Sequence, residues 1–314
     1  MLSNTELENL NDKINIIKQN MINNPFFNDY KENIYSMYYY LINNIEIKNL
    51  TNGPEKYVSL KEAFSLVYNF LDKISNNYSK ELDNDIKNGK IFTSSNNYYD
   101  KDSKKIYLNF ENNINDSIHL LHEYIHKLSN KISNSKSQRD SYFVYDEAIA
   151  ILGELYFKDY LLKNNFSKYD IDLINNIRKK ELINSAYSYL ILYPLYDIYI
   201  NKGSINNNDL IELKNKKILL YRNDEEVKNN INIILNKEIQ KLPYKHVFGT
   251  IVSTYLYNQN ISLETYKNMI EDLDTMTLVD FSNKYNINFE FEKTIKDVCE
   301  IYKLKEEEKT KWDI

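Results

Sequence analysis

Three histidines and one glutamate lie within eight residues of the chain: His119, His122, Glu123 and His126. The last three of them form the pattern His-Glu-x-x-His. Because residues four apart lie on the same face of an α-helix, His122 and His126 can direct their imidazoles at one point. A catalytic zinc site needs two such imidazoles, with a glutamate near the metal but not bound to it. The same pattern also occurs in amphipathic helices whose histidines are hydrogen-bonded in a core. A third metal ligand elsewhere in the chain would distinguish a zinc site from such a helix.

Glu147 is the candidate for that third ligand. It follows His126 by 21 residues, which is enough for the chain to turn back and present a carboxylate from a second, antiparallel helix. Glu154 lies seven residues further on the same face and can accept a hydrogen bond from a ligand imidazole; Asp146 is an alternative for that role. The two glutamates could be solvated surface acids, but the apolar residues 148–152 between them would make an unpaired carboxylate costly. The sequence therefore predicts one Zn²⁺ per chain.

Composition limits the classes of protein that the chain can belong to. Its 314 residues are enough for a substantial core, and only five glycines and four prolines favour long helices. The formal net charge of -5 argues against nucleic acid or an anionic membrane as a partner. Cys299 is the only cysteine, so no intrachain disulfide and no cysteine-based metal site is expected. The polar N-terminus and the absence of a long apolar run predict a cytoplasmic protein without membrane insertion, with leaderless secretion left open.

Helical periodicity dominates the chain, so we predict a mainly α fold. The expected helices cover residues 5–48 as two segments, 59–82, 141–164, 168–201 with a kink or division at Pro194, 206–220 and 223–240. The metal helix is expected to start at Asn115 or Asp116, either of which can cap it. We assign residues 1–88 to an N-terminal helical part and 89–314 to a catalytic part.

Two β-prone stretches, residues 90–95 and 105–110, precede the metal helix and are separated by a polar turn at 99–103. They predict a small hairpin or sheet. An exposed strand at this place could hold an extended peptide by main-chain pairing, but an ordinary structural hairpin explains the pattern equally well.

A late segment, residues 244–257, contains the fourth histidine, three tyrosines and a glycine. Histidine and tyrosine side chains can stabilise the oxyanion that forms when water attacks a peptide carbonyl. A buried helix with locally satisfied polar groups is an equally good interpretation of these residues alone.

Three of these motifs together resemble the oligoendopeptidase F and thimet oligopeptidase family of zinc peptidases. In that family, as in residues 106–126, a short strand and an acidic turn lead into a His-Glu-x-x-His helix. Glu147-Ala148 followed by Glu154 is similar to the family's Glu-Ala-Pro-Ser-x-x-x-Glu segment, and residues 244–257 resemble its late helix. The resemblance implies a multi-helix metallopeptidase fold with a small sheet beside the zinc helix and a substrate cleft between two helical lobes.

The resemblance also implies a role for each matching residue. The zinc ligands would be His122, His126 and Glu147, and the general base would be Glu123. His246 and Tyr255 would contact the oxyanion and the substrate. Tyr244 and Tyr257 would be further substrate contacts. Three features depart from the family, and one of them is that Ile149-Ala150 replaces the Pro-Ser of its glutamate segment. Ile125 stands where the family has glycine and could crowd the substrate, and the family's N-terminal scaffold has no counterpart here, which would leave the cleft more open.

The sequence thus predicts a zinc-dependent endopeptidase that hydrolyses peptide bonds in oligopeptides or exposed protein segments. Two alternatives remain open at this point. One is a secreted, toxin-like gluzincin protease that acts on one specific protein. The other is a peptide-binding module that keeps the cleft but has lost turnover. The oligomeric state and the preferred cleavage site have no signal in the sequence.

Overall fold

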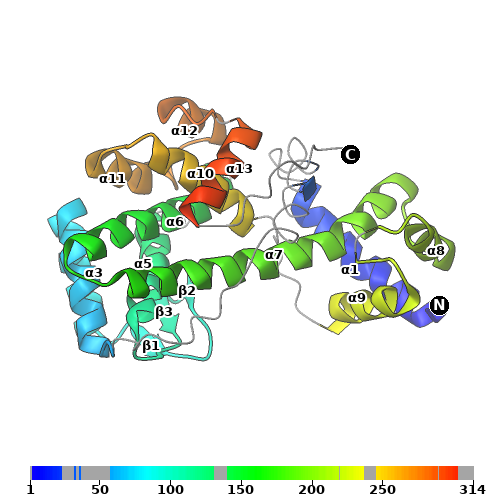
Figure 1. The fold of residues 1–314 in the computed structure, drawn as a ribbon, viewed down its shortest axis with the longest axis horizontal. Coiled ribbons are helices and arrows are strands. Elements are labelled where there is room, and N and C mark those ends of the chain that lie inside the picture. The colour runs from blue at the N-terminus through cyan, green and yellow to red at the C-terminus, as the bar shows by residue number, and fades with distance from the viewer. Residues whose placement is uncertain are drawn as a thin grey trace. The chain divides into compact units, whose positions relative to one another are not determined.

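The structure is a computed structural model that describes residues 2–22, 32, 35–36, 57–130, 140–218, 220–236, 245–288 and 290–302. Within these residues the protein is mainly α-helical with one small three-stranded sheet (Figure 1). The chain divides into two compact units, and we describe each by itself. The first unit comprises Met1–Ile45, Glu181–Val247 and Glu307–Ile314, and the second comprises Glu46–Lys180 and Phe248–Glu306. The boundary after residue 88 and the cleft between two lobes stay predictions.

The first unit contains α1 (Asn4–Ile22), the later part of α7 (Lys168–Lys202), α8 (Asn207–Asn215) and α9 (Asp224–Asn236). Helix α1 packs on α9, where the Lys13 ammonium donates to the Ile234 carbonyl at 2.9 Å. Helix α7 continues as one helix through Pro194, so the division predicted there does not occur. The second helix predicted within residues 5–48 falls mostly outside the described residues.

The second unit begins with α3 (Leu60–Ile74) and α4 (Asn76–Lys87). Helix α3 starts in a capping box, in which Ser59 and Glu62 each accept a hydrogen bond from the other's backbone N–H. The sequence predicted a single helix over residues 59–82. The structure instead places Ser75 in an extended conformation, with φ of -163°, and this residue separates the two helices.

The sheet follows, with strands β1 (Ile91–Thr93), β2 (Tyr98–Asp100) and β3 (Lys105–Leu108) in the order β1-β3-β2. Strands β1 and β3 pair in parallel, and β2 pairs with β3 in an antiparallel hairpin. The predicted sheet is therefore present, but its hairpin joins β2 to β3, and β2 occupies part of the segment predicted as a turn. The β3 side chains of Ile106 and Leu108 are buried on one face of the sheet.

The metal helix, α5 (Ile114–Ser129), packs against α6 (Asp140–Lys163). Its N-cap is Asn113, and Asp116 completes a capping box, so the helix starts slightly before the predicted residues. The unit closes with α10 (Lys245–Asn258), whose first three residues belong to the first unit, and with α11 (Leu263–Asp272), α12 (Leu278–Lys284) and α13 (Phe291–Ile301). Helix α11 contacts α3, α5 and α6, and α12 contacts α6. In the part of the chain that the structure describes, no helix has the length and apolar character needed to span a membrane.

Candidate metal centre

A glycine allows α5 and α6 to approach each other closely. A Cβ atom on Gly153 of α6 would overlap the Ile125 Cδ1 atom of α5 and the Tyr266 hydroxyl of α11. That hydroxyl donates to the Ile149 carbonyl of α6 at 2.9 Å. The fully buried Ile125 side chain thus packs into the space left by the missing Cβ atom. These contacts fix the spacing of the two helices that carry the predicted ligands.

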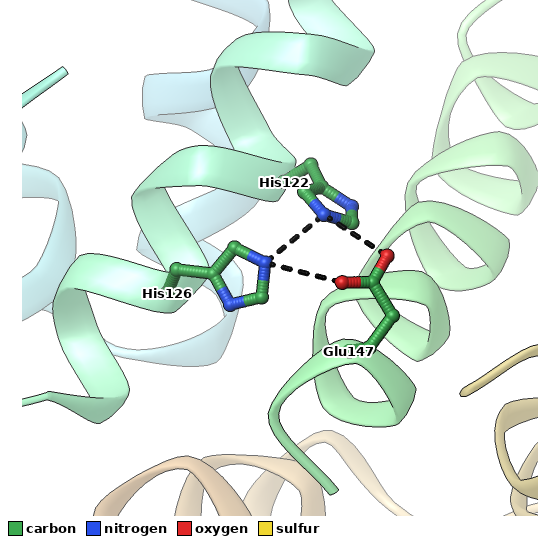
Figure 2. Close-up of side chains that lie close together, drawn as sticks. All are labelled: His122, His126 and Glu147. Carbon is green, nitrogen blue, oxygen red and sulfur yellow. Dashed lines mark hydrogen bonds and ion pairs between the residues drawn. The ribbon is translucent and has the colours of Figure 1, made fainter. Parts of the chain in front are cut away.

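The predicted ligands converge between these two helices. His122 and His126 extend from α5 and Glu147 from α6 toward a common point, as Figure 2 shows. The two Nε2 atoms lie 3.0 Å apart, the Glu147 Oε1 atom lies 3.5 Å from His122 Nε2, and Oε2 lies 3.6 Å from His126 Nε2. Two atoms that bind one tetrahedral zinc at about 2.1 Å are about 3.4 Å apart. The separation of the two Nε2 atoms, and the distance from each of them to one Glu147 oxygen, are close to this value.

The surroundings of this group fit a cation. The imidazole side chains are 12% exposed and the Glu147 side chain 4%. Two ring nitrogens and a carboxylate that face one another at these distances need a shared proton or metal ion, because converging lone pairs are costly in a buried place. The three residues therefore form a group that could hold a metal ion.

A second carboxylate orients the first imidazole. The Glu154 Oε1 atom lies 2.6 Å from His122 Nδ1 and also pairs with the guanidinium of Arg178 on α7. Burial would raise the pKa of Glu154, but Arg178 and His122 outweigh it and lower this pKa to about 2. An ionised Glu154 accepts a hydrogen bond from Nδ1–H, so in the neutral imidazole the Nε2 lone pair of His122 faces the common point. The contact predicted between Glu154 and a ligand imidazole is present.

Charge at this place favours a positive ion. Burial alone would lower the pKa of His122, but the neighbouring carboxylates of Glu147, Glu154 and Glu123 raise it to about 9. Glu123 itself is buried on α5 beside His122, and Asp146 is buried on α6 beside Glu147. The roles predicted for Glu123 and Asp146 stay predictions.

The residues predicted from the late segment lie on α10, which begins at Lys245, except Tyr244, which lies outside the described residues. The Tyr255 hydroxyl donates to the Asn286 carbonyl at 3.1 Å. The Tyr257 hydroxyl donates to Asp159 at 2.8 Å, and burial together with that carboxylate raises the pKa of Tyr257 to about 12. His246 belongs to the first unit. Substrate contacts by these side chains stay predictions.

Sequence reasoning missed Arg178. The only available signal was its rarity, because arginine supplies three of the 40 basic residues and the others are lysines. It also missed the packing role of Gly153, which lies in the middle of the apolar α6 segment next to Glu154.

No family model matches the sequence, and no curated protein matches it. Among solved structures, a protein from Chlamydophila abortus described as a "putative peptidase" is similar over 96% of this chain, with 16% sequence identity and a TM-score of 0.47. The match covers 56% of that protein, so this chain spans about half of its length. At this level of likeness, what the chain does has to be argued from the residues of the metal centre.

Proposed function

We propose that the chain is a zinc-dependent endopeptidase that hydrolyses peptide bonds in oligopeptides or in exposed segments of proteins. One observation carries this proposal: ligand atoms of His122, His126 and Glu147 converge to within 4.8 Å of one another in a chain that places Glu123 directly after the first ligand. A histidine pair and a distal glutamate form the ligand set of many zinc peptidases.

The donor set supports zinc over the other common ions. Calcium and magnesium prefer all-oxygen ligands in larger or octahedral shells, whereas two imidazoles and one carboxylate suit zinc. The interatomic separations of 3.0 to 3.6 Å support a tetrahedral ion. Three protein ligands leave a fourth position for water or substrate, as a catalytic site requires.

Each residue then has a chemical task. Zinc, when bound, polarises the peptide carbonyl and lowers the pKa of water to about 7. Glu123 takes the proton of the attacking water and passes it to the leaving amine. Tyr255 donates a hydrogen bond to the oxyanion and Tyr257 contacts the substrate chain, whereas the roles of His246 and Tyr244 stay sequence predictions.

Incubation with a mixed peptide library tests the proposal. We expect mass spectrometry to show new internal termini with the zinc-loaded protein and none with Glu123→Gln, although both bind the same amount of zinc. Glu264→Gln removes an exposed carboxylate from α11 and is the matched control that should cleave normally. Zinc-loaded protein that binds peptides without producing new termini would contradict the proposal and favour a peptide-binding module.

A further inference from the structure

Arg178 is joined to the metal centre by one carboxylate oxygen. Its guanidinium Nη2 atom pairs with Glu154 Oε1, and the same oxygen lies 2.6 Å from His122 Nδ1. The side chains of Arg178 and Glu154 are 7% and 8% exposed. All three residues belong to the second unit, on helices α7, α6 and α5 respectively. The contacts run without interruption from Arg178 to the first predicted metal ligand.

The geometry gives the guanidinium a task that the imidazole cannot perform. Glu154 is a buried carboxylate, and Glu147 and Glu123 are two further buried carboxylates near the same imidazole. Once His122 binds a metal through Nε2 its ring is neutral, so its Nδ1–H offers Glu154 a hydrogen bond but no opposite charge. Arginine keeps its charge at all relevant pH values, and the Nη2 atom of Arg178 donates to the same Glu154 oxygen that faces the His122 ring.

We propose that Arg178 is a positioning residue of the metal centre. It holds the Glu154 carboxylate in place, and Glu154 in turn holds the His122 ring with Nε2 directed toward His126 and Glu147. Groups behind a metal ligand commonly change metal affinity by about 10- to 100-fold, because they fix the orientation of the ligand ring. The proposal rests on the metal site of the proposed function and adds a residue that none of its motifs contains.

Zinc affinity, measured by competition with a chromophoric chelator and without substrate, tests this role. We expect Arg178→Met to weaken zinc binding by about 10-fold or more. In a Glu154→Gln background the same substitution should change the affinity by less than about threefold, because the two residues act through one contact. The matched control is Lys158→Met, which removes another link between the same helices, from Lys158 to Asn175 at 3.0 Å. It should leave the zinc affinity within about twofold of the unsubstituted protein.

Two results would overturn the proposal. The first is an unchanged zinc affinity in Arg178→Met. The second is a loss of zinc affinity on Arg178→Met that is equally large in the unsubstituted protein and in the Glu154→Gln background, as a general effect on folding would produce. If Arg178→Met does not fold, Arg178→Lys replaces it. Lysine keeps the charge but not the fork, so we expect a smaller loss of affinity and a changed visible absorption spectrum of the cobalt-loaded protein. Identical affinity and spectrum in that variant would also refute the positioning role.

The zinc-affinity test of Arg178 does not depend on peptidase activity. A protein that binds zinc but cleaves no peptide contradicts the proposed hydrolase, whereas the comparison of affinities still decides the role of Arg178. A protein that binds no zinc at this centre overturns both proposals.

Discussion

Gly249 of α10 lies directly against Glu147 of α6. A Cβ atom on Gly249 would stand 2.7 Å from the Glu147 Cγ atom and 3.0 Å from its Cβ atom, closer than such atoms normally approach. The backbone of α10 therefore supports the stem of the glutamate whose carboxylate completes the metal group. A side chain on Gly249 would have to move that stem.

Gly249→Ala should therefore weaken zinc binding by about 10-fold, in the range typical of groups that orient a metal ligand. Alanine favours a helix over glycine by about 1 kcal/mol, so helix propensity alone would make this variant more stable. Ser253→Ala, one turn later on α10, removes a hydroxyl without adding volume and should leave zinc affinity unchanged. A chelator competition assay measures both, and an unaltered affinity in Gly249→Ala would show that the contact does not place Glu147.

We expect the Ile125 side chain to stabilise the folded protein. Its side chain is fully buried and packs against Gly153, so the bulk that the sequence predicted to crowd the substrate fills the space between two helices. Ile125→Ala should lower the free energy of unfolding by about 2–5 kcal/mol, as cavities in a core do. Val279→Ala shortens a side chain that is 64% exposed and should change the free energy of unfolding by less than about 0.5 kcal/mol. Urea denaturation measures both values, and a stable Ile125→Ala variant with faster peptide turnover would contradict this packing.

Asp85 of α4 anchors the end of the metal helix. Its carboxylate pairs with Lys127 of α5, lies 3.0 Å from the Lys90 ammonium, and accepts from the Tyr124 hydroxyl at 3.1 Å. Burial would raise the pKa of Asp85, but Lys127 and Lys90 outweigh it and lower that pKa. The stabilisation is therefore complete above the pKa of about 3.9 in the unfolded chain and is lost as pH falls through the lower folded value.

Asp85→Asn should accordingly lower the free energy of unfolding by about 3 kcal/mol at pH 7, because it breaks a buried ion pair. The difference from the unsubstituted protein should shrink as the pH falls below about 4. Asp83→Asn breaks an exposed pair with Lys87 on the same helix and should change stability by less than about 1 kcal/mol. Urea denaturation from pH 7 downward checks this, and a pH-independent difference would contradict the assignment.

Tyr255 is predicted to contact the oxyanion. Tyr255→Phe, which lacks the donor, should lower kcat about 100-fold while zinc binding is retained. Tyr255 would have to exchange its bond to the Asn286 carbonyl for one to the substrate. Tyr156→Phe removes a hydroxyl that donates to the Ile261 carbonyl and is the control with normal kcat. Full turnover in Tyr255→Phe would remove this residue from the mechanism.

The group formed by His122, His126 and Glu147 could be predicted from the sequence because its signals lie within short segments of the chain. The spacing of His122 and His126 places them on one helical face, and the apolar residues around Glu147 mark it as a carboxylate that needs a partner. The start of α6 at Asp140 also lies within one residue of the predicted position. Helical periodicity and the cost of burying charge are sufficient for these inferences.

The rest depends on contacts between distant segments, for which the sequence holds no periodic signal. Arg178 stands among lysines in a polar stretch, and only the fold brings it to Glu154. Tertiary contacts likewise decide the parallel pairing of β1 with β3, because the sequence of the same stretches fits a hairpin equally well. The break at Ser75 was missed because the apolar stripe of α3 continues at nearly helical spacing into α4.

Anomalous scattering at the zinc edge, from crystals of the zinc-loaded protein, tests the metal centre most directly. The predicted result is one strong peak per chain, about 2.0–2.2 Å from His122 Nε2, His126 Nε2 and a Glu147 carboxylate oxygen. Absence of a peak there, or a peak elsewhere with the Glu147 carboxylate turned away from both imidazoles, would contradict the centre and with it the proposed hydrolase.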